Sequence, residues 1–224
     1  MSDFGNARAV LNDDIKVNVY LEVYHFHVNP AGVKFAPTAQ VRVAALIASS
    51  LNIQSSDFLA AQYHFAREGD APVGMVINQG KILAVSDGFL LLLGGAVENT
   101  GTMSAEMGHV AMVSGDRATV TITDNKMVSV AVDEATAAAI TLADGTPVKD
   151  AVANRGEIST PGGKVTLTAE TLSNIFDKAI NQTGMIQASS GVSASTFRRA
   201  SATWESTWSK PAPLCEPMWK MTPL

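Results

Sequence analysis

Few residues in this chain have types and spacing that could do chemistry. His25 and His27 are separated by one residue, so in a strand both imidazoles lie on the same face and could bind one metal ion. Protein zinc sites use three or four ligands, and no third ligand stands at a suitable spacing. We therefore interpret the two residues as surface histidines and predict neither a metal nor a cofactor.

Acidic residues are the other candidates. Cleavage of a polysaccharide needs clustered carboxylates, either as an acid/base pair or as Ca²⁺ ligands with an arginine base. Asp116, Asp124 and the pair Asp133 and Glu134 fall at expected turns and do not recur at a regular spacing. We interpret them as solvated turn acids and predict that the chain is not an enzyme. A carbohydrate-active enzyme is the alternative, and it would require three or more acids converging in one exposed groove.

Composition narrows the function classes further. The chain has 224 residues, of which 46% are hydrophobic and 17% are charged, which is typical of one ordered domain. The net charge is −5, so we expect no nucleic-acid partner. The single cysteine, Cys215, excludes an internal disulfide framework. Residues 1–25 contain charged positions where a signal peptide would be apolar, so no export signal is expected there.

The element that repeats is a seven-residue pattern: Asn, any residue, Gly, any residue, an apolar residue, any residue, a small residue. It occurs at residues 78–84, 99–105 and 154–160, and again at 182–188 with Gln in place of Asn. Such self-similarity indicates stacked coils of a β-solenoid, ahead of an ordinary sandwich. The apolar position of each copy should enter the core, and a period-2 apolar run follows each of the first three copies.

The residue types shared by the copies of the pattern predict an asparagine ladder. We expect the Asn of each copy to adopt a left-handed turn conformation and to hydrogen-bond the Asn of the next coil. The Gly two residues later should supply the backbone freedom of the corner. The predicted ladder residues are Asn78, Asn99 and Asn154, with Gly80, Gly101 and Gly156. Replacing Asn99 with Ala should then cost about 1–3 kcal/mol.

The spacing between copies predicts the rest of the architecture. A separation of 21 residues suits one coil, the 55 residues from Asn99 to Asn154 suit two coils plus an insertion, and the last gap suits one coil plus a bend. Good helix formers predict short helical insertions or bends at 133–139 and 169–180. The prediction is an all-β, parallel β-helix (a single-stranded solenoid) over 28–191, with atypical strands at 1–27 and an irregular, Trp- and Pro-rich tail at 192–224.

Residues 29–190 also resemble the N-terminal secretion domain of filamentous-haemagglutinin-type exoproteins of two-partner secretion. The resemblance rests on the Asn-Pro-Ala-Gly-Val-Lys-Phe segment at 29–35 and on further matching segments at 39–43, 46–53, 57–58, 63–65, 76–80, 91–94, 97–101 and 128–133. Two departures stand out: the family usually has Asn at the position of Ala31, and a second, earlier Asn-Pro motif is not present.

This resemblance implies a right-handed β-helix without enzymatic activity. It implies a module that addresses a large adhesin or cytolysin to a dedicated outer-membrane β-barrel transporter, and a secreted or cell-surface location. Asn29, Pro30 and Gly32 would form the motif that the transporter recognises. A host glycan or cell-surface receptor would be the adhesin's further partner. A non-functional remnant of an adhesin gene is a third interpretation.

Overall fold

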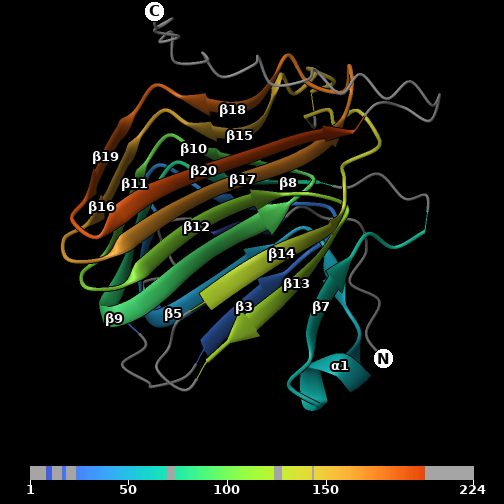
Figure 1. Cartoon of the computed structure of the whole chain (residues 1–224). Coiled ribbons are helices and arrows are strands. Elements are labelled where there is room, and N and C mark those ends of the chain that lie inside the picture. Colours follow the sequence, from blue (N-terminus) through green and yellow to red (C-terminus); the bar gives the residue numbers. More distant parts are fainter. Residues whose placement is uncertain are drawn as a thin grey trace, which may run out of the picture.

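The computed structural model describes residues 9–11, 17–18, 24–69, 74–123, 128–142 and 144–199, and these form stacked coils of parallel strands around one axis (Figure 1). Each coil places one strand in sheet A, turns a corner, and then places two strands, or one long bent strand, in sheet B. The predicted all-β, parallel β-helix is therefore confirmed. The parts of the predicted termini at 1–8, 12–16, 19–23 and 200–224 lie outside the described residues.

Sheet A is wholly parallel, and each of its strands comes from a different coil. Its order is β1 (Ala9–Leu11), β4 (Val33–Phe35), β8 (Met75–Asn78), β10 (Ala96–Asn99), β15 (Asp150–Asn154) and β18 (Lys178–Gln182). Residues at equivalent positions of successive coils face each other across the ladder. Val33, for example, pairs with Val76, which pairs with Val97.

Sheet B carries the other two faces of each coil and is also parallel. Strands β2 (Val17–Asn18) and β3 (Tyr24–Val28) pair with β5 (Gln40–Ser49), which pairs with β9 (Lys81–Gly94). The following coils add β11 (Thr102–Ala105) and β12 (His109–Ser114), then β16 (Glu157–Thr160) and β17 (Lys164–Leu172), then β19 (Met185–Ala188) and β20 (Gly191–Arg199). The proposed boundaries at 27/28 and 191/192 remain predictions, although strands β3 and β20 run across them.

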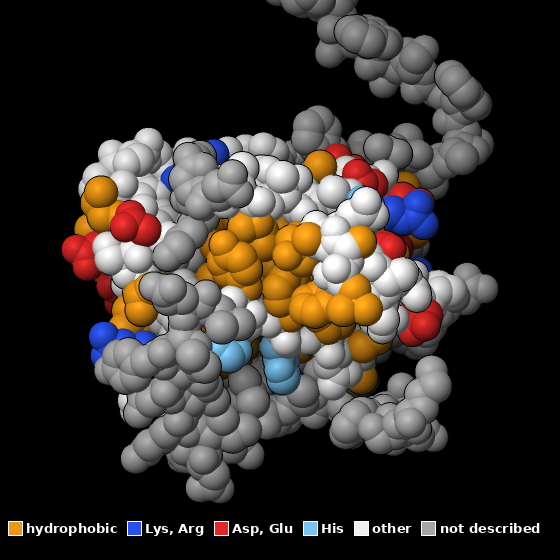
Figure 2. All heavy atoms as spheres, turned by 90° about the horizontal axis from the view of Figure 1, so that it is seen from below, with side chains coloured by type: hydrophobic (Ala, Val, Ile, Leu, Met, Phe, Trp, Pro, Cys, Tyr) orange, Lys and Arg blue, Asp and Glu red, His pale blue; other side chains and the backbone are white. Residues whose placement is uncertain are grey.

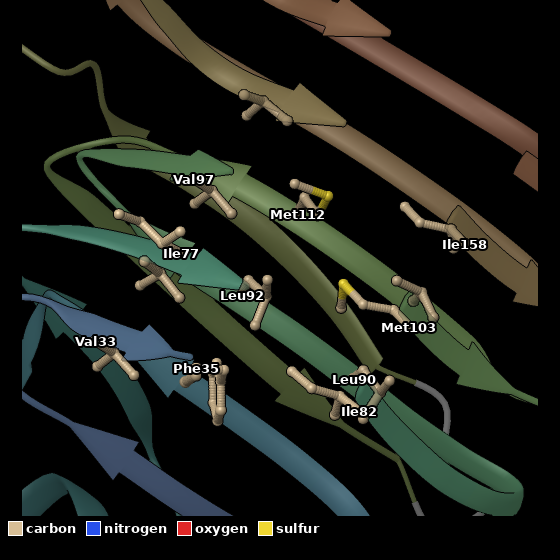
Figure 3. Packing of buried hydrophobic residues seen from close by; sticks show 14 of the residues in the cluster. Val33, Phe35, Ile77, Ile82, Leu90, Leu92, Val97, Met103, Met112 and Ile158 are labelled. Carbon is tan, nitrogen blue, oxygen red and sulfur yellow. The ribbon is translucent and has the colours of Figure 1, made fainter. Parts of the chain in front are cut away.

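The core between sheets A and B is built of stacked aliphatic side chains. The apolar position of the repeat forms one such column, in which Ile82, Met103 and Ile158 are fully buried and pair in register. Val33, Val97, Leu90 and Leu92 project into the same interior (Figure 3). Each buried aliphatic side chain contributes on the order of 1.5–3 kcal/mol, so the columns hold the coils together.

A smaller antiparallel sheet, sheet C, covers part of the outer face of sheet B. Its order is β14 (Val128–Glu134), β13 (Arg117–Ile122), β7 (Tyr63–Ala66) and β6 (Asn52–Ile53), and the helix α1 (Ser55–Leu59) connects β6 to β7. This explains the continuous run Phe89 to Leu93. Leu90 and Leu92 face the solenoid interior, whereas Phe89, Leu91 and Leu93 pack under sheet C, so the strand is buried on both faces.

Neither predicted segment is helical, and the predicted bend is found only in the second, in the turn between β17 and β18. Residues 133–134 end strand β14, and the alanine-rich segment after them stays extended, because Thr136 forms a parallel bridge to Thr171 of β17. Residues 169–172 continue β17, and a turn then leads to β18. Pairing with the solenoid overrides helix propensity at both places. None of the described helices is long and apolar enough to cross a membrane.

The interpretation of the 55-residue gap as two coils is also wrong. Asn99 pairs directly with Asn154, so β10 and β15 belong to neighbouring coils. The additional residues leave the solenoid after β12, form the β13–β14 hairpin of sheet C, and return through residues 135–149 to β15. A long excursion from one corner therefore replaces the second coil.

Candidate functional site

The structure brings the three ladder asparagines together in one buried column. Asn78, Asn99 and Asn154 end successive strands of sheet A, pair in register and have no exposed surface. Asn78 Nδ2 donates to Asn99 Oδ1 at 2.8 Å, and Asn99 Nδ2 donates to Asn154 Oδ1 at 2.8 Å. The column ends with Phe35 on one side and Gln182 on the other, at the same register.

The reason for glycine in the repeat differs from the predicted one. Gly80, Gly101 and Gly156 do not have the positive φ of a left-handed corner. A Cβ on Gly101 would lie 2.1 Å from the carbonyl oxygen of Gly80, and a Cβ on Gly156 would lie 2.1 Å from that of Gly101. Glycine is needed because successive corners stack backbone on backbone. The glycines further along each coil do the same in a second column: Gly88, Gly108 and Gly163.

The predicted left-handed conformation of the ladder asparagines is also wrong. The described non-glycine residues with positive φ are Ala61, Asp87, Met107 and Asn174. The ladder asparagines are the last residues of their strands, and their backbone stays extended. Their side chains, rather than their φ angles, make the corner, as Asn78 Oδ1 accepts a hydrogen bond from Gly80 N at 3.1 Å.

The predicted recognition motif forms a tight turn between β3 and β4. Gly32 N donates to Asn29 O at 2.9 Å, with Pro30 at the second position of the turn, where its fixed φ is favourable. The Asn29 side chain closes the turn from inside, because its Oδ1 accepts from Ala31 N at 3.0 Å. Gly32 has φ of 113°, which requires glycine.

The next layer of the solenoid holds this turn at two points. Asn29 N donates to Ser49 O at 2.9 Å, and Gly74 N donates to Pro30 O at 2.8 Å. A Cβ on Gly74 would lie 2.3 Å from the backbone of Ala31, so the turn packs directly against the next coil. Asn29, Pro30 and Ala31 remain half-buried, which leaves part of a rigid surface feature accessible.

His25 and His27 are half-buried rather than fully exposed, so the predicted surface position holds only in part. They pair with Leu46 and Ala48, which belong to the interior core, so both imidazoles point towards the inside of the solenoid at its N-terminal end. Both Nε2 atoms are buried and have no hydrogen-bond partner among the described residues. Burial lowers the pKa of His27. Figure 2, which looks at the molecule from below, shows hydrophobic side chains gathered on this face with histidine beside them.

The candidate acids divide between the interior and the surface. Asp116 is 7% exposed, and its Oδ2 pairs with Arg67 Nη1 at 3.4 Å and accepts from Ala137 N at 3.1 Å, so its interpretation as a solvated acid is wrong. Asp133 and Glu134 are exposed, and Asp124 lies outside the described residues. Within the ranges that the structure describes, no three His, Cys, Asp or Glu side chains are grouped to hold a metal ion.

Sequence reasoning missed a polar groove of about 360 Å³ on the outer face of sheet C. Three carboxylates line it, those of Asp57, Glu68 and Asp133, together with Asn52 and other polar side chains. These residues come from three strands or connections far apart in the sequence and carry no repeat. Only the antiparallel pairing of β6, β7 and β13 brings them together, so no sequence signal could have found the groove.

The chain is similar to one known protein family and to a solved structure. The family model described as the TPS secretion domain matches residues 16–205. The crystal structure of the HMW1 secretion domain from Haemophilus influenzae is 20% identical in sequence, with a TM-score of 0.47, over 75% of this chain and 45% of that chain. This chain therefore spans less than half the length of that solved domain. No curated protein sequence matches it.

The family match takes in the described strands from Val17 to Arg199, that is, both the solenoid and the sheet on its flank. It confirms the resemblance to the secretion domain of two-partner exoproteins. The chain belongs to the TPS secretion domain family, the non-catalytic secretion module of two-partner secretion.

Proposed function

We propose that this domain directs the polypeptide that carries it to an outer-membrane β-barrel transporter, and that the transporter recognises the turn from Asn29 to Gly32. The family match over residues 16–205 is the observation that carries the export role. The turn is our candidate for the recognised feature because it presents polar groups on a fixed backbone at the start of the solenoid.

Rigidity supports this assignment. The turn is fixed by its own 2.9 Å backbone hydrogen bond, by the Asn29 side chain and by two hydrogen bonds to the next layer of the solenoid. A partner that binds it loses little conformational entropy, because the turn is already ordered before binding. A weak contact of a few residues can then still be selective.

The experiment compares two prolines in equivalent turns of one coil. The chain, preceded by a signal peptide, is co-expressed with a two-partner transporter, and the ratio of secreted to cell-associated protein is measured. Pro30→Ala changes the proposed motif. Pro37→Ala is the matched control, since Pro37 is exposed at the second position of the turn in which Ala39 N donates to Ala36 O at 2.9 Å.

We expect Pro30→Ala to lower secretion about tenfold, or about 1.4 kcal/mol, because it removes the ring surface and the fixed φ that pre-orders the turn, and Pro37→Ala to leave secretion unchanged. Both purified variants should unfold within a few degrees of the parent. Equal secretion of the two variants would refute recognition at this turn. Ala31→Asn, which restores the residue usual in the family, should raise secretion while Asn29 Oδ1 still accepts from the residue 31 amide.

An adhesin role, with a host glycan or cell-surface receptor as partner, is the finer part of the proposal. It concerns the whole exported protein, and adherence of beads coated with that protein to cultured cells tests it. A carbohydrate-active enzyme is the second candidate, because Asp57, Glu68 and Asp133 converge in one groove. Release of reducing ends from polysaccharides would support it. A gene remnant predicts no export with any transporter.

A further inference from the structure

The groove on sheet C forms where a small side chain lies between larger polar side chains of the neighbouring strands. Ala66 of β7 pairs with Asn52 on one side and with Arg117 on the other, so a methyl group lies between two larger polar side chains. In the next row of the sheet, His64 pairs with Thr119. The shortness of Ala66 between its neighbours creates the depression, and the ladder hydrogen bonds of sheet C fix its walls.

The charged groups of this groove are paired within the protein. Asp57 Oδ2 lies 3.4 Å from His64 Nδ1, Arg117 Nη1 lies 2.9 Å from Glu134 Oε1, and Asp133 Oδ2 accepts from Thr119 Oγ1 at 2.7 Å. An anionic ligand would meet three carboxylates, and a cationic one would meet two guanidinium groups. Neither kind of ion gains enough there to offset the loss of its hydration.

The lining also exposes carbon surface. Ala66 is its apolar residue, and the aliphatic parts of the polar side chains add to that surface, which suits the C–H faces of a sugar ring. The groove also offers carboxylate acceptors, guanidinium donors, a hydroxyl and the amides of Asn52 and Gln54, which both donate and accept. A volume of about 360 Å³ suits a small ligand.

From these features we propose that the sheet C groove binds a neutral saccharide. Sugar hydroxyls donate and accept at short, regular intervals, which is what mixed walls of amides, carboxylates and guanidinium groups can satisfy. The site lies outside the solenoid, on a sheet built from inserted segments, and it is separate from the turn at Asn29. The inference does not rest on the export role, because binding is measured on the purified chain.

The test is saturation-transfer NMR on the full chain. The neutral probes are di- and trisaccharides of glucose, galactose, mannose and N-acetylglucosamine, and the anionic probes are 3′-sialyllactose and a heparin disaccharide. Gln54→Ala and Thr119→Ala remove groups from the groove. Gln62→Ala and Thr121→Ala are matched controls, because Gln62 and Thr121 are exposed residues of the same region that do not line the groove.

We expect at least one neutral probe to bind saturably, about five- to tenfold more weakly in each groove variant, and with unchanged affinity in both controls. Release of reducing ends that stops in both groove variants would likewise place the saccharide in this groove. The proposal is overturned if no neutral probe binds saturably, if the anionic probes bind as tightly as the neutral ones, or if groove and control variants bind alike.

Discussion

Asn99 is the residue whose replacement tests the solenoid most directly. It is fully buried and stands between two other asparagines, with hydrogen bonds of 2.8 Å to each. In Asn99→Ala, Asn154 Oδ1 loses its donor, and Asn78 Nδ2 keeps only a 3.4 Å contact to Thr102 O. Each buried polar group left unpaired costs about 1–3 kcal/mol, so two affected neighbours place the total near 3 kcal/mol, the upper end of the sequence-based range.

The assay is thermal unfolding followed by circular dichroism, with urea unfolding as a second measure. For a chain of this length, about 3 kcal/mol corresponds to a fall in Tm of roughly 6–12 °C. Gln182→Ala is the matched control. Gln182 occupies the same register one coil further on, but it is exposed, and its Nε2 donates to Gly184 O at 2.9 Å rather than to a neighbouring ladder residue.

We expect the control to lower Tm by less than about 2 °C. The result that refutes the reasoning is an Asn99→Ala variant as stable as Gln182→Ala. That outcome would mean that the hydrogen bonds between the asparagine side chains do not stabilise the coils and that aliphatic stacking alone does.

Three further perturbations follow from the same coils. Gly101→Ala places a Cβ 2.1 Å from the Gly80 carbonyl oxygen, so it should destabilise the fold by about 3 kcal/mol or more, and a Tm within 2 °C of the parent would contradict this. Met107→Gly relieves a φ of 55° at an exposed residue and should raise Tm by about 1–3 °C, which thermal unfolding checks. Burial lowers the pKa of His27 and of His109, the latter despite the hydrogen bond from its ring to a backbone carbonyl, so their contribution to stability is complete above pH 6.5 and is lost as the pH falls below it. The urea midpoint should therefore be lower at pH 5 than at pH 7.5, and His109→Gln should reduce the difference between the two midpoints.

The repeat made the solenoid predictable because residues at equivalent positions of neighbouring coils contact each other. The residue types that must stack, such as Asn78 with Asn99 and Ile82 with Met103, recur at one coil length, so the sequence itself displays the columns. For Gly101, the sequence predicted the position of the glycine correctly but not the reason for it. Its reason lies in the carbonyl of the coil before it, which a single turn cannot reveal.

Sheet C could not be predicted for the opposite reason. Its strands pair residues that are far apart in the chain, as Arg117 does with Ala66, and none of them repeats. The helix predicted over the alanine-rich segment failed because Thr136 finds a backbone partner in β17, which propensity does not include. The inward direction of His25 became visible only once β3 was paired with β5.

The long segment between β12 and β15 makes the coil that follows it more costly to add during folding than the coil before it. Neighbouring ladder asparagines are 21 residues apart before it and 55 residues apart across it. Closing the longer loop costs about 0.9 kcal/mol more in chain entropy. A chain that folds from its N-terminal end must therefore wait at β12 until residue 150 becomes available. We expect the same corner to accept added residues without shifting the pairing of β10 with β15, because the segment between β12 and β15 lies outside the stacked coils.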